Sequence, residues 1–229
     1  MTEQSARRPS TRTWVALAVA LAVVAAVALV VAVTGQQRAP QPAATTADRS
    51  SSPSAERAPA TVPGQPTAAV DEAAVVPDPV SVAIPAIDVT SDLLRLDLND
   101  DGSVEVPPLE PDDQAGWYQR GPAPGAVGPA VILGHVDSAE HGPGVFFDLG
   151  ALRPGAEVTV ARADGTVAVF AVDRVERHRK DEFPTIAVYG DTADAQLRLI
   201  TCGGDFDSAA RSYEDNVIAF ATLVDIRPV

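Results

Sequence analysis

The sequence predicts a mostly β domain that closes into a barrel, preceded by one transmembrane helix and a disordered linker. Two observations predict the barrel: from residue 77 the chain breaks into short β-type runs, and Gly, Pro and Asp turn signals separate these runs. A third observation, an uncharged run of Val, Ala and Leu at 15–33, predicts the membrane helix. A chain of 229 residues has room for one globular domain with such appendages.

The apolar run at 15–33 is long enough to cross a bilayer, since a helix rises about 1.5 Å per residue. Arg7, Arg8 and Arg12 precede it, and the positive-inside rule then places 1–14 in the cytoplasm and the rest of the chain outside. A cleaved signal peptide is the competing interpretation, but its apolar region would be shorter and a small-residue cleavage site would follow it. Both interpretations export the domain, and we favour the retained single-pass anchor.

Residues 35–76 are rich in Pro, Ala, Thr, Ser and Gln and contain few large apolar side chains. A segment of this composition cannot bury enough surface to offset the entropy lost on ordering. We therefore expect a disordered or partly extended tether that lifts the domain at 77–229 away from the membrane.

The domain at 77–229 contains eight candidate strands, in which β-branched and apolar residues are bounded by turn residues. Short helices are expected at 145–152 and at 192–195. The expected strands are 80–84, 93–98, 103–106, 130–134, 157–161, 167–175, 197–202 and 217–224.

Composition excludes several classes of function. A formal net charge of −14 argues against nucleic-acid binding, which requires a basic surface. One cysteine allows no intrachain disulfide, and one cysteine with three histidines excludes a Cys-rich zinc site. A metal bound mainly by carboxylates is the alternative that stays open, but no regular acidic spacing of a calcium loop is present, and we expect neither a metal nor a cofactor.

The single cysteine, Cys202, ends an apolar strand and is followed by Gly203 and Gly204. Glycines allow a substrate to approach the backbone closely, so the thiol lies where a nucleophile could act. A buried structural thiol is the alternative, because free cysteine is among the most buried residue types. Its position at a strand end in an exported domain favours the nucleophile.

His135 also follows an apolar strand, in the sequence Gly134-His135, and a histidine at a barrel rim can exchange protons near neutral pH. A turn histidine bonded to a neighbouring side chain is the alternative. We expect His141 and His178, which lie in polar surroundings, to be surface residues.

Arg211 lies nine positions after Cys202, before the last expected strand. If that strand pairs with the cysteine strand, Arg211 could return to the thiol, where a guanidinium could stabilise a developing oxyanion. Ion pairing with the acidic residues that follow it is the alternative, and Arg198 is a second candidate for the same role. A thiol, a rim histidine and an arginine together match an activated nucleophile with an oxyanion stabiliser.

These residues stand in motifs that resemble the sortase family, and more narrowly its actinobacterial class F, over most of 80–224. The Gly134-His135 and Thr201-Cys202 pairs, in this order, are specific together. The resemblance rests on Ile84-Pro85-Ala86-Ile87, Gly116-Trp117-Tyr118, the run from Pro129 to Ser138, Val145-Phe146-Phe147-Asp148-Leu149, Leu199-Ile200-Thr201-Cys202-Gly203-Gly204, and Tyr213-Glu214-Asp215-Asn216-Val217.

The resemblance implies an eight-stranded sortase barrel and a cysteine transpeptidase. In that mechanism Cys202 attacks a sorting signal of the Leu-Pro-x-Thr-Gly kind between Thr and Gly, and a cell-wall amine resolves the thioacyl-enzyme. His135 would protonate the leaving amine and activate the incoming one, Arg211 would hold substrate and stabilise the oxyanion, and Thr201 would line the substrate site. We expect a monomer whose partners are sorting-signal proteins and a cell-wall precursor.

Two other functions stay open at this point. Another exported Cys–His enzyme, such as an L,D-transpeptidase or a cysteine peptidase, would carry its cysteine in a different local motif. A non-catalytic surface β-domain would hold the same barrel around an inert thiol.

Overall fold

The computed structural model describes residues 38–42, 76–109 and 113–229. The chain divides into two units, Met1–Arg38 and Ala39–Val229, and the second contains the barrel. None of the helices in the described ranges is both long and apolar enough to cross a membrane. The expected anchor at 15–33 lies outside the described residues, as does most of the expected tether.

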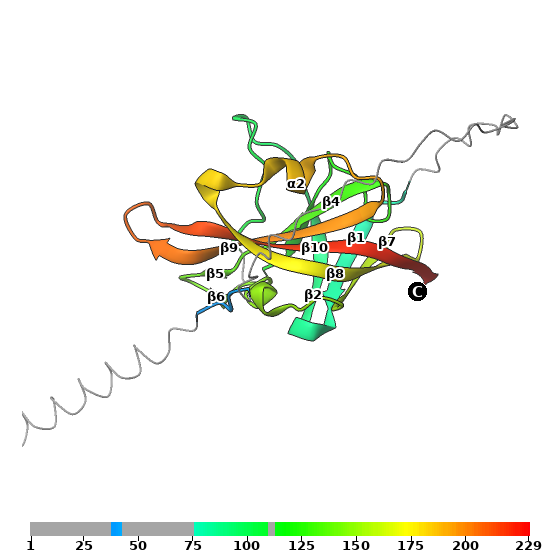
Figure 1. Cartoon of the computed structure of the whole chain (residues 1–229), viewed down its shortest axis with the longest axis horizontal. Helices are drawn as coiled ribbons and strands as arrows, with labels where there is room; N and C mark the ends of the chain where they lie inside the picture. Colours follow the sequence, from blue (N-terminus) through cyan, green and yellow to red (C-terminus); the bar gives the residue numbers. More distant parts are fainter. Residues whose placement is uncertain (1–37, 43–75, 110–112) are drawn as a thin grey trace, which may run out of the picture. The chain divides into compact units, whose positions relative to one another are not determined.

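Eight strands form a closed barrel, which confirms the expected barrel and its strand number. Around the barrel the order is β1-β2-β3-β4-β9-β10-β8-β7, and Figure 1 shows the long strands β8, β9 and β10 running side by side. The pairs β2–β3 and β4–β9 are parallel and the others are antiparallel. The strands are β1 (Pro79–Ile84), β2 (Val89–Leu96), β3 (Ala115–Tyr118), β4 (Gly128–Leu133), β7 (Glu157–Arg162), β8 (Thr166–Arg179), β9 (Ala195–Asp207) and β10 (Ser212–Pro228).

The barrel interior is filled by the inward side chains of every strand, as the period-two alternation of a strand requires. In β7, for example, Val158 and Val160 are fully buried while the residues between them are partly exposed. Phe146, Phe170 and Leu149 are the large side chains at the centre of this core. Complete burial of such side chains stabilises the fold by about 1.5–3 kcal/mol each.

A second apolar cluster lies on the outer face of the barrel wall, over β4, β9 and β10. Its buried members are Val131, Val188, Ile200, Ile218 and Phe220. Val188 belongs to α2 (Thr185–Tyr189), which Figure 1 shows in the connection between β8 and β9. Since β4, β9 and β10 are covered on both faces here, their sequences read as continuous apolar runs.

Four sequence expectations about local structure were wrong. The run 103–106 is no strand and contributes one isolated bridge, Leu98 with Val104, because the Asn99–Ser103 turn leaves too little chain for a ladder. Strand β3 was missed because it has only four residues. The helix expected at 145–152 is reduced to the 3-10 helix η2 (Leu149–Ala151). The helix expected at 192–195 is absent there, since Ala195 already begins β9, and the helix α2 lies earlier in the chain.

Smaller elements complete the described part of the barrel domain. The short strands β5 (Asp137–Ser138) and β6 (Gly142–Pro143) form a hairpin directly after His135. The other 3-10 helices are η1 (Pro85–Ile87) and η3 (Lys180–Glu182).

Candidate active site

Cys202 lies in β9 on the outer face of the barrel wall, and its side chain is half-buried. Ile200, two residues earlier and therefore on the same face, belongs to the outer cluster. The register pairs Cys202 with Asn216 of β10, and Asn216 with His178 of β8. Cys202, Asn216 and His178 therefore form one row across three strands, with neighbouring strands about 4.8 Å apart.

His135 follows β4, which is the neighbour of β9 on the side away from β10. Leu133 of β4 pairs with Ile200 of β9 in parallel, and the Gly134 amide donates to the Ile200 carbonyl at 3.1 Å. His135 lies two residues after Leu133, beyond the end of β4, and Cys202 lies two residues after Ile200 in β9. Both candidates therefore lie toward the same end of two neighbouring parallel strands, and their catalytic roles stay predictions.

The His135 ring is held by the connection between β2 and β3. Its Nε2 lies 2.7 Å from the carbonyl oxygen of Pro107. A carbonyl can only accept, so Nε2 donates and carries the proton. In the neutral ring Nδ1 is then the basic nitrogen, able to take up a proton from a thiol or an amine.

Arg211 occupies a different place from the one expected. It lies exposed in the turn between β9 and β10, with a left-handed φ of 52°. It lies five positions before Asn216, which corresponds to roughly 17 Å along an extended strand. Strand β10 does pair with β9, the cysteine strand, as expected. The β9–β10 hairpin extends beyond the pair Cys202 and Asn216, and Arg211 lies in its turn (Figure 1). Its catalytic role stays a prediction.

Asn216 is a further candidate that the sequence reasoning did not select. It stands opposite Cys202 in the register, and a side-chain amide supplies two N–H donors. To find it from the sequence, one would count residues from the hairpin turn along both strands to locate the partner of Cys202. The register shift between Tyr213 and Asp215 makes that count give the wrong partner.

Thr201 faces the other way. Its side chain is only 3% exposed, and its register partner Val217 belongs to the interior core. Within the described ranges its hydroxyl oxygen has no hydrogen-bond partner. The alternation of β9 thus separates this hydroxyl from the face that carries Cys202, and direct substrate contact by Thr201 stays a prediction.

Tyr213 ties the β9–β10 hairpin to the segment that follows His135. Its hydroxyl donates to Asp137 Oδ2 at 2.6 Å. Burial raises the pKa of Tyr213, and the hydrogen bond and charge of Asp137 raise it further, with a smaller contribution from the charge of Cys202.

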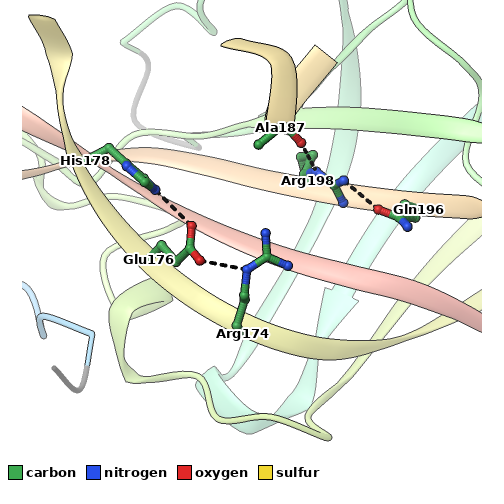
Figure 2. A network of polar contacts seen from close by, with 6 residues as sticks. All are labelled: Arg174, Glu176, His178, Ala187, Gln196 and Arg198. Carbon is green, nitrogen blue, oxygen red and sulfur yellow. Dashed lines mark hydrogen bonds and ion pairs between the residues drawn. The ribbon is translucent and has the colours of Figure 1, made fainter. Parts of the chain in front are cut away.

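A polar network lies along the outer face next to the catalytic row (Figure 2). Glu176 Oε2 lies 2.9 Å from His178 Nε2, and Glu176 Oε1 accepts from Arg174 Nε at 2.7 Å. Burial alone would raise the pKa of Glu176, but these two partners outweigh it and the pKa is lowered. His178, expected at the surface, is half-buried because this contact turns its ring along β8.

Arg198, the second candidate for the oxyanion role, serves another purpose. It is 4% exposed, and its guanidinium donates to the Ala187 carbonyl of α2 at 3.1 Å and to Gln196 Oε1 at 2.5 Å (Figure 2). The ring of Phe220 lies 4.7 Å from its guanidinium carbon. Burial, with the nearby charge of Arg174, lowers the pKa of Arg198 to about 10. It fastens α2 to the strand that carries Cys202.

A shallow pocket lies beside His135, lined by Leu109, Asp113 and the β5–β6 hairpin. Asp113 Oδ2 accepts from the Val145 amide, while its Oδ1 is buried without a partner in the described residues. In the part of the chain that the structure describes, no group of three or more His, Cys, Asp or Glu side chains is arranged to hold a metal ion.

The sequence and the barrel fold are similar to those of known proteins. A sortase domain model matches residues 82–224. A sortase A from Corynebacterium diphtheriae superimposes with a TM-score of 0.50 at 21% identity, covering 66% of this chain and 62% of that one. The SrtA sortase from Actinomyces oris gives a TM-score of 0.50 at 19% identity, covering 69% and 89%. At such identities the solved structures show a shared fold alone. No curated protein matched the sequence.

Proposed function

The chain belongs to the sortase family, whose domain model matches more than half of it, and we propose that it cleaves a sorting signal of the Leu-Pro-x-Thr-Gly kind. Sortases are cysteine transpeptidases that act outside the cytoplasm, and this chain is an enzyme of that family. The substrate motif, the acceptor and the residue roles are the parts that we propose. The observation that supports them is the parallel register in which Leu133 and Ile200 are partners, because these residues stand two positions before His135 and Cys202.

In the proposed reaction the Cys202 thiolate attacks the carbonyl carbon of the threonine in the signal. The carbonyl electrons move onto oxygen and return as the C–N bond to glycine breaks. His135 gives its proton to the departing amine, which leaves a thioester on Cys202. An incoming amine from a cell-wall precursor loses its proton to His135, attacks the thioester and restores the thiolate.

The oxyanion needs a hydrogen-bond donor near Cys202. Asn216, opposite Cys202 in the register, is our first candidate, because its amide can donate without leaving its strand. Arg211 remains the second candidate and would have to act after the hairpin bends toward the site. Thr201 contributes most simply through its backbone, since its side chain faces inward.

The outer cluster lies next to Cys202, and its Ile200 and Ile218 are buried together with Val188 of α2. We infer that the signal passes along the edge of α2. A Leu-Pro pair is uncharged and apolar, so its burial against an apolar side of the site is favourable. We place the chain in class F and infer the single-pass anchor at 15–33 on the sequence motifs and apolar run described above.

The experiment offers the protein a Leu-Pro-x-Thr-Gly peptide library together with an amine acceptor. Ligated product whose new bond follows the threonine is the expected result. A wall stem peptide, supplied in a parallel reaction, is expected to stay unchanged. Acylation by the stem peptide instead would assign an L,D-transpeptidase activity, and no acylation by either would leave a non-catalytic β-domain.

A further inference from the structure

Two residues of the expected tether, Pro40 and Gln41, contact the barrel. Ala39, Pro40, Gln41 and Pro42 belong to the same unit as the barrel, although 33 residues separate them from the next described segment. Gln41 Oε1 accepts from Arg177 Nη1 of β8 at 3.3 Å, and Gln41 Nε2 donates to the Ala39 carbonyl at 3.2 Å. The composition of 35–76 had indicated no ordered contact.

Gly150 of η2 provides the space for this contact. A Cβ added at Gly150 would overlap the Pro40 carbonyl oxygen and lie 2.9 Å from the Pro40 carbonyl carbon. The third neighbour is the Gln41 carbonyl carbon at 3.3 Å, so no other atom of the described chain is nearer than that. A side chain at position 150 would therefore collide with Pro40, and glycine leaves the space that Pro40 and Gln41 occupy.

The same contact reaches the catalytic strands. Arg177, which donates to Gln41, also pairs with Asp215 of β10 through Nε at 3.4 Å. Asp215 is the register partner of Gly203, the residue after Cys202. A Cβ at Gly203 would lie 3.9 Å from Gln41 Oε1.

We propose that residues 39–42 are a docking segment that binds the barrel at Gly150 and Arg177 and stabilises the barrel domain there. The docking itself rests on the contacts of Pro40 and Gln41 alone.

The docking is tested on the full chain by a double-substitution cycle with thermal unfolding as readout. The two changes are Gly150→Ala and replacement of residues 39–42 by Gly-Ser-Gly-Ser. Each alone is expected to lower Tm by a few degrees, and Gly150→Ala is expected to lower it no further in the replaced chain. Equal effects of Gly150→Ala in both backgrounds, or none in either, would overturn the docking.

Gly121→Ala is the matched control for the cycle. A Cβ at Gly121 would meet its nearest atoms at 3.4 Å and 3.5 Å, ordinary contact distances, and they belong to Tyr118. Its effect on Tm is expected to be the same in the native and replaced chains. A difference between the two backgrounds at Gly121 would show that the replacement disturbs the barrel at large, and would count against the docking.

Discussion

Cys202 in β9 and Asn216 in β10 are register partners, so both side chains leave the same face of the barrel wall. His135 follows β4, which pairs with β9 on the side away from β10. The proposed nucleophile therefore lies on the strand between the one that carries Asn216 and the one that leads into His135. Arg211, the charged candidate, lies in the hairpin turn instead.

Asn216→Ala separates the two candidates for the oxyanion role. If Asn216 donates to the oxyanion, its removal is expected to lower kcat about 10²–10³-fold, while KM changes little. Arg211→Lys is then expected to leave kcat within a few-fold, because a side chain in the exposed turn makes no contact in the reaction. Steady-state kinetics with a fluorogenic signal peptide provide both numbers. A large loss in Arg211→Lys with an unaffected Asn216→Ala would return the role to Arg211, whose planar fork lysine cannot reproduce.

Tyr213→Phe tests the link between the hairpin and the segment after His135. Loss of the hydrogen bond to Asp137 is expected to destabilise the fold by about 1–3 kcal/mol, as for bonds to charged groups. Because the folded pKa of Tyr213 is raised above its ordinary value of 10.0, this stability is complete below about pH 10 and is lost as pH rises beyond it. Denaturant unfolding of the native chain and of Tyr213→Phe from pH 7 to pH 11 measures this difference in stability.

The control for that prediction is the double variant Tyr213→Phe/Asp137→Ala. Its loss of stability should be smaller than the sum of the two single losses, since both remove the same bond. Strict additivity would show that the two side chains act independently.

Arg198→Met tests the attachment of α2. The Ala187 carbonyl then loses its buried donor, with an expected cost of about 1–3 kcal/mol. Because the signal is proposed to pass along the edge of α2, KM for the peptide is expected to rise more than kcat falls. Arg174→Met is the matched control: it also removes a cation from Phe220, at 3.8 Å, but leaves the bond to α2 intact. An equal rise in KM in both variants would contradict the assignment.

Glu176→Gln tests the network with His178 and Arg174. The folded pKa of Glu176 is lowered from its ordinary value of 4.5, so its stabilisation is present above that pH and is lost as pH falls through the folded pKa. The variant is expected to be less stable at pH 7 and to show a smaller fall in stability between pH 5 and pH 3. Asp181→Asn removes an exposed ion pair with Arg179, and it should change the stability at pH 7 and the fall in stability between pH 5 and pH 3 much less. A parallel curve for Glu176→Gln and the native chain would refute this.

The local sequence pattern predicted the barrel and selected Cys202 and His135 as site candidates, because neighbouring residues are enough to indicate strand ends and glycine turns. Other features depend on contacts between distant residues. The position of Arg211 follows from the hairpin length and its bulge, and Asn216 becomes visible only through the register. Helix α2 depends on the outer cluster that covers Val188. The contact of Gln41 with Arg177 contradicts its surrounding composition, which by itself indicates disorder.

The most direct test of the central claim is the mass of the intact protein after brief exposure to a Leu-Pro-x-Thr-Gly peptide without an acceptor amine. We predict a gain equal to the peptide portion ending in threonine, located on Cys202 and removed by hydroxylamine. Cys202→Ala should show no gain while retaining the thermal unfolding curve of the native chain. An unmodified Cys202 under these conditions, or full turnover by Cys202→Ala, would contradict the account.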